Sequence, residues 1–129
     1  MTQTNLRTAN RALWTAQILI ALLFLFAGVM KFVLPMDKMQ GPIALPAGFI
    51  RFIGIAEITG AFGLILPGLL RIRPTLTSLA ASGLVVIMTG ATVLTIVGMG
   101  IAPAIFPLVV GVVAAAIAYG RWRVAPLGV

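Results

Sequence analysis

The chain has 129 residues, of which 61% are hydrophobic and only 9% are charged, and its net charge is +7. Soluble domains carry about 25% charged residues, and small ones leave much of their surface in water, so the composition excludes an ordinary water-soluble fold. The basic residues stand in pairs at the ends of apolar runs instead of forming one patch, which excludes nucleic-acid binding.

Four apolar runs follow one another along the chain, at about 12–34, 47–70, 74–97 and 101–120. Each is close to the roughly 20 residues that a helix needs to cross about 30 Å of hydrocarbon, and none alternates as a barrel strand does. Only helices and closed barrels satisfy their backbone in lipid. We therefore predict an all-α membrane protein, a four-transmembrane-helix antiparallel bundle that forms a single domain over 1–129.

The basic residues also predict the orientation of this bundle. They lie before the first run, between the second and third, and after the fourth: Arg7, Arg11, Arg71, Arg73, Arg121 and Arg123. The loop between the first two runs holds Lys38 beside Asp37, and the last loop holds no charge. This alternation predicts cytoplasmic N- and C-termini, with Trp14 and Trp122 at the same headgroup level. We expect a multi-pass membrane protein, surrounded by membrane lipids.

One acid, Glu57, lies inside an apolar run. A charged residue at the centre of a membrane helix costs roughly 2.5–3.5 kcal/mol on insertion scales, so such residues usually have a partner or a function. Lys31 lies near the end of the first run, and side chains lean toward the N-terminus of their helix, so Lys31 and Glu57 lean toward each other. We predict a Lys31–Glu57 ion pair. Arg51 leans toward the non-cytoplasmic headgroups and is predicted to be a rim residue or a binder of anionic headgroups.

One face of the third run carries hydroxyl groups within an arc of about 100°: Thr75, Ser78, Ser82, Thr89 and Thr92. We expect this stripe to face the bundle interior, with Thr89 at about the depth of Glu57. Thr89 and Thr92 therefore join Lys31, Arg51 and Glu57 as candidate binding residues. Small residues are predicted to allow close helix packing at Ala56, Gly60, Gly83, Gly90, Gly111 and Ala115.

A purely structural role for these polar residues stays open. Lys31 could snorkel alone to the interface, and Glu57 could be satisfied by Thr89 or by a backbone carbonyl. The chain has no cysteine and no histidine, and only two acids, so thiol chemistry, iron–sulfur clusters, Cys/His zinc sites and His-ligated haem are excluded for this chain alone. We predict no metal site and identify no catalytic residue.

The pattern of these residues resembles the DoxX-like family of small four-helix membrane proteins. The resemblance covers about residues 20–97 and rests on Gly28-x-x-Lys31, Arg51-x-x-Gly54-x-x-Glu57-x-x-Gly60-Ala61-x-Gly63-Leu64-x-Leu66-Pro67, Pro74-x-Leu76, Ala80-Ala81-x-Gly83-Leu84 and Met88-x-Gly90-Ala91. It implies an inner-membrane protein that is linked with respiratory or redox partners, such as quinone-coupled sulfur oxidation or oxidative-stress assemblies. In this family pattern many members carry a histidine about seven residues after the motif methionine, where this chain has Thr95, so the resemblance does not imply a histidine-based quinone or proton relay here.

Three functions compete at this point. The first is an accessory or binding subunit that holds a quinone or lipid near Glu57 and Lys31, or braces a redox membrane-protein partner. The second is a small proton-coupled transporter that uses Glu57, a role that pairing with Lys31 would weaken. The third, an enzyme acting on its own, is the least favoured because no cofactor motif is present. Oligomerisation is left open.

Overall fold

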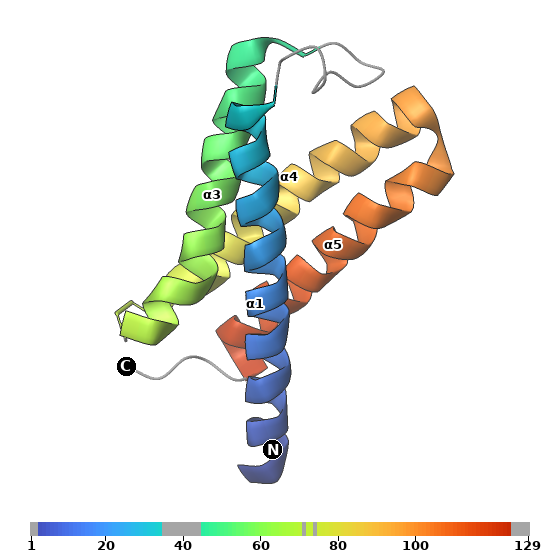
Figure 1. Cartoon of the computed structure of the whole chain (residues 1–129). Helices are drawn as coiled ribbons and strands as arrows, with labels where there is room; N and C mark the ends of the chain where they lie inside the picture. The colour runs from blue at the N-terminus through green and yellow to red at the C-terminus, as the bar shows by residue number, and fades with distance from the viewer. Residues whose placement is uncertain (1–2, 35–44, 71, 74, 125–129) are drawn as a thin grey trace.

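The computed structural model describes residues 3–34, 45–70, 72–73 and 75–124 (Figure 1). Within these residues the elements are α1 (Gln3–Val33), α3 (Ala47–Leu70), α4 (Thr75–Met99), α5 (Ile101–Tyr119) and a short π-helical turn, η1 (Gly120–Val124). Four of them are long and apolar enough to cross a membrane, counted over the described ranges. The predicted all-α four-helix membrane bundle is therefore confirmed.

The first helix begins earlier than the apolar run that predicts it. α1 has 31 residues and starts at Gln3, whereas the run starts at about residue 12. No proline or glycine interrupts the polar residues ahead of the run, so the helix continues through them. At 1.5 Å per residue α1 is about 46 Å long, more than the roughly 30 Å of a hydrocarbon core. Its first turns project beyond the rest of the bundle (Figure 1).

α4 and α5 form a tight antiparallel hairpin. Gly100 is the only residue between them, and its φ of 101° lies in the left-handed region that side chains rarely adopt. Its N–H bonds to the carbonyls of Thr95 and Ile96, which satisfies the end of α4. This glycine therefore makes the abrupt reversal between the two helices sterically accessible.

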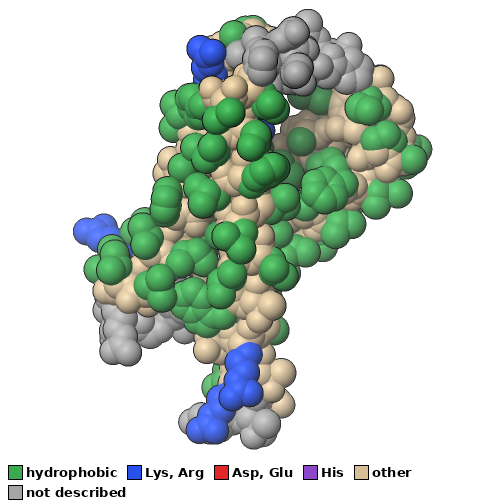
Figure 2. All heavy atoms as spheres, in the orientation of Figure 1, with side chains coloured by type: hydrophobic (Ala, Val, Ile, Leu, Met, Phe, Trp, Pro, Cys, Tyr) green, Lys and Arg blue, Asp and Glu red, His purple; other side chains and the backbone are tan. Residues whose placement is uncertain are grey.

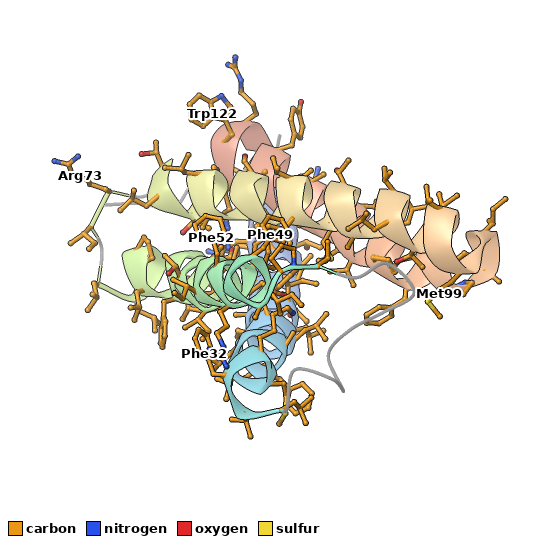
Figure 3. All side chains as sticks on the ribbon, turned by 90° about the horizontal axis from the view of Figure 1, so that it is seen from above. Phe32, Phe49, Phe52, Arg73, Met99 and Trp122 are labelled. Atoms are coloured by element: carbon orange, nitrogen blue, oxygen red, sulfur yellow. The ribbon has the colours of Figure 1, made fainter. Side chains whose placement is uncertain are left out.

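The helices are arranged as two hairpins joined at one end. α1 packs mainly against α3, and α4 packs mainly against α5, while α3 also contacts α4. We call the end at which α1 begins and α5 finishes the proximal end, and the other the distal end. Toward the distal end α4 and α5 lean away from α1 and α3 (Figures 1 and 3). The two hairpins meet mainly through α3 and α4, and α1 also contacts α5 and η1.

A small core lies where the four helices meet. Each helix contributes one large apolar side chain that is fully buried: Phe24, Leu64, Leu84 and Ile117. Alanines surround them, because small residues let membrane helices approach closely. Outside this core most large apolar side chains are exposed, and Figure 2 shows them covering the middle of the molecule with Lys and Arg toward its ends. This surface is suited to contact with lipid.

Candidate functional site

A close glycine contact brings α1 and α3 together near the distal end. A Cβ atom added to Gly28 would lie 2.8 Å from the carbonyl oxygen of Gly54 and 2.7 Å from Ile58 Cγ1. A Cβ atom added to Gly54 would lie 3.1 Å from the carbonyl oxygen of Gly28 and 3.0 Å from Lys31 Cβ. The two glycines therefore let the backbones touch, and they set Lys31 directly against α3.

Lys31 and Glu57 form an ion pair one turn from this glycine contact. Lys31 Nζ lies 2.6 Å from Glu57 Oε1, as the opposed lean of the two side chains predicts. The Glu57 side chain is 3% exposed and that of Lys31 is 27% exposed. Within the described part of the chain, Lys31 is the only partner of this carboxylate oxygen. The pair thus holds a charged group of α3 inside the bundle against the last turn of α1.

Arg51 stands apart from this pair. It lies near the start of α3, is exposed, and has no hydrogen bond or ion pair with any other described residue. The role of Arg51 as a rim residue or a binder of anionic headgroups stays a prediction.

The hydroxyl stripe of α4 does not face the interior as a whole, and this prediction is wrong for most of its members. Only Ser78 is buried, and it donates a hydrogen bond to the carbonyl of Ala118 on α5. Thr89 is exposed and donates to Val85 O, while Thr92 is half-buried and donates to Met88 O. Such bonds to the preceding turn satisfy a hydroxyl without any neighbouring helix, so burial is not required.

The candidate binding residues therefore do not form one cluster. Lys31 and Glu57 meet between α1 and α3, whereas Thr89 and Thr92 line a groove of about 270 Å³ between α4 and α5. Thr95 also bonds to its own helix, at Ala91 O.

The small residues divide into two groups. A Cβ added to Gly60 would lie 2.8 Å from Leu84, and one added to Gly111 would lie 3.2 Å from Met88, so both allow close packing as predicted. For Gly83 and Gly90 the same prediction is wrong, because nothing in the described structure lies within 4 Å of a Cβ added there. Both glycines are exposed.

A second polar cluster, not predicted as such, lies at the proximal end. Arg121, 3% exposed, donates from Nε to Gln17 Oε1 at 2.6 Å and from Nη1 to Asn10 Oδ1 at 2.8 Å. Its guanidinium also stacks over the ring of Trp14, 5.5 Å from the ring centroid. Arg121 therefore links η1 to α1 and, unlike its neighbour Arg123, is not exposed at the surface.

Gln17 extends this cluster to α3. Arg121 can only donate and the carbonyl of Leu64 can only accept, so the amide of Gln17 must accept through Oε1 and donate through Nε2. Its Nε2 lies 2.5 Å from Leu64 O. Pro67 lacks the N–H that would bond to the carbonyl of Gly63, one residue before Leu64. The fully buried amide of Gln17 therefore links Arg121 to the backbone of α3 close to this interrupted turn.

Gln17→Leu is expected to lower the free energy of unfolding by about 2–3 kcal/mol, because it removes two buried hydrogen bonds, one from the guanidinium of Arg121 and one to the carbonyl of Leu64. Chemical unfolding in detergent micelles measures this value. Thr15→Val is the matched control, since Thr15 is exposed and bonds only to Arg11 O on its own helix. Equal stability of the two variants would contradict the assigned role of the proximal cluster.

A wide apolar groove runs between α3 and α4. Its volume is about 800 Å³, and Gly60, Gly63, Ala80 and Gly83 leave space along it. Among its lining residues the only polar side chain is that of Thr59, and neither Lys31 nor Glu57 lines it. Figure 3 shows Phe52, at its distal end, extending from α3 toward α4. From Phe52 to Leu70 the groove follows α3 for about 27 Å, nearly the roughly 30 Å thickness of a hydrocarbon core.

Four helices able to cross a membrane, within the described chain, and a largely apolar surface define a multi-pass membrane protein. The model of the DoxX-like family matches residues 15–117, which is most of the chain, and the protein belongs to this family. The matched region contains the Gly28–Gly54 contact, the Lys31–Glu57 pair and the α3–α4 groove. No curated protein and no solved structure matched the chain.

Proposed function

We propose that this DoxX-like protein is an accessory subunit located in a bacterial-type inner membrane. In this role the protein binds a lipid-like or quinone-like molecule and supports a redox membrane-protein partner in the bilayer. The α3–α4 groove is the observation that carries this proposal. Its volume of about 800 Å³ falls within the roughly 300–1,000 Å³ that is usual for small-molecule sites. Its apolar lining suits a hydrocarbon tail, and its length suits a ligand that lies along the bilayer normal.

In this proposal the Lys31–Glu57 pair positions α3 and does not touch the ligand. Gly54 and Ile58 pack toward α1, whereas Gly60 and Gly63 pack toward α4, so the pair and the groove occupy different faces of α3. A transporter would need Glu57 to exchange protons with both sides of the membrane. The burial of Glu57 and its contact with Lys31 support the accessory role over that alternative.

Gly83→Leu is expected to abolish ligand binding without unfolding the protein. Gly83 lines the groove, and because nothing lies within 4 Å of an added Cβ, the new side chain enters open space. Gly90→Leu is the matched control on the same helix, equally open but outside the groove lining. Thermal unfolding in detergent, with and without added quinones or lipids, reads out binding as a rise in melting temperature.

The parent protein and Gly90→Leu should both gain stability from at least one long-chain ligand, and Gly83→Leu should gain none. A ligand that stabilises all three equally would contradict binding in the groove. Co-purification from native membrane under mild detergent tests the partner, because an accessory subunit should carry a redox membrane protein with it. Recovery of the chain alone, under conditions that keep other membrane complexes intact, would contradict the bracing role.

A further inference from the structure

We propose that the distal half of the α3–α4 groove binds a phospholipid with an anionic headgroup, whose phosphate is held by Arg51 and whose acyl chain lies between α3 and α4. This inference rests on the proposed function and names the ligand class for the same groove. It departs from the expected site in one respect, because the ligand contacts Arg51 but not Lys31 or Glu57.

The charge that recognises the headgroup is at the distal mouth of the groove. Arg51 directly precedes Phe52 and lies one turn before Ile55, and both of these residues line the groove. Its side chain leans toward the start of α3, at the level of the distal headgroups. An arginine there is not explained by the bias that gathers basic residues at the other face of the membrane.

Arg51 differs from Lys31 in its interactions. Lys31 forms an ion pair with Glu57, whereas Arg51 has no protein partner among the described residues. Guanidinium groups bind phosphate oxygens through two parallel hydrogen bonds, and the N-terminus of α3 adds a favourable dipole for an anion. Gly48, in the first turn of α3, leaves the backbone beside this position open, since nothing in the described structure lies within 4 Å of an added Cβ.

The length of the groove fits a chain from the distal leaflet. Half of a hydrocarbon core is about 15 Å thick, and ten residues of helix span the same distance. An acyl chain that starts beside Arg51 would therefore run past Phe52 and reach Gly60, where α3 meets Leu84 of α4. Gly83 lies next to that level, so a side chain added there would block the end of the acyl chain.

Native mass spectrometry of the full chain in detergent, titrated with dioleoyl phosphatidylglycerol or dioleoyl phosphatidylcholine, tests the inference. We expect the anionic lipid to bind about fivefold more tightly, as one basic residue near a membrane surface provides. Arg51→Gln should remove this preference and keep the affinity for phosphatidylcholine. Arg11→Gln, which removes an equally exposed arginine from the proximal end of α1, should leave the preference unchanged. Glycerol phosphate, which lacks the chain, should not compete.

Three results would overturn the inference about the headgroup without contradicting the proposed function of the groove. They are equal binding of the two lipids, a preference that survives in Arg51→Gln, and competition by glycerol phosphate. Failure of Gly83→Leu to weaken binding of either lipid would instead remove the proposed function along with the inference. A dimer that dissociates in Gly83→Leu would assign the groove to a second copy of the chain and would also overturn both.

Discussion

Glu57→Ala is expected to lower the free energy of unfolding by about 3 kcal/mol, the lower end of the range for removing one partner of a buried ion pair. The variant leaves the ammonium of Lys31 beside a void between α1 and α3. The loss stays at the lower end because Lys31, 27% exposed, is close enough to the end of α1 to turn toward the distal headgroups. Unfolding in mixed micelles, followed by helix content, measures the change.

Two further variants separate charge from packing. Glu57→Gln keeps the volume and can still accept a hydrogen bond from Lys31, so its loss should be about half that of Glu57→Ala. The double variant Lys31→Met with Glu57→Leu removes both charges and should be as stable as the parent, or more stable, because a buried pair often only balances its own desolvation. If Glu57→Ala unfolds like the parent, or if the double variant loses the sum of the single losses, the pair does not hold α1 against α3.

Gly28→Ala is expected to destabilise the protein by about 1–3 kcal/mol, although alanine is the better helix former. The added methyl group would lie 2.8 Å from the carbonyl oxygen of Gly54, which is backbone and can yield only if α1 and α3 separate. Separation also pulls Lys31 from Glu57. In a protein that already carries the larger substitution Gly28→Leu, adding Glu57→Ala should therefore cause little further loss of stability. Unfolding free energies of the single and combined variants measure both terms.

Gly90→Ala is the matched control, and its change in stability should have the opposite sign. Nothing lies within 4 Å of its added Cβ in the described structure, so only helix propensity changes, and a gain of up to about 1 kcal/mol is expected. If Gly28→Ala were also stabilising, there would be room for a Cβ atom between the backbones of α1 and α3, and the glycine contact would not be what holds Lys31 against α3.

The four membrane-spanning helices and the contact between Lys31 and Glu57 could be predicted from the sequence. Apolar runs of about 20 residues can only be helices in lipid once barrel alternation is absent, so length and composition decide the fold class. The Lys31–Glu57 pair was predictable because the membrane leaves few ways to satisfy a lone carboxylate and because antiparallel helices lean their side chains toward each other. The family motif that includes these residues gave an independent indication of the same region.

The remainder of the site could not be derived in this way. Gln17 and Arg121 are 104 positions apart in sequence, and no local pattern indicates that they meet. Arg121 looked like a headgroup residue because it ends an apolar run, and only the packing of η1 against α1 buries it. Gly83 and Gly90 resembled packing positions, yet nothing in the described structure lies within 4 Å of a Cβ added at either residue. Helix rotation and tilt depend on neighbours that periodicity alone does not identify.

The most direct test of the groove as a binding site is the mass of any ligand that stays bound when the protein is extracted from its native membrane. Native mass spectrometry of the parent chain, extracted in mild detergent without added lipid, should show one long-chain molecule retained per protein. Gly90→Leu should retain the same molecule, and Gly83→Leu should have lost it. An identical adduct on both variants, or no adduct on the parent, would contradict the assignment of the α3–α4 groove as a binding site.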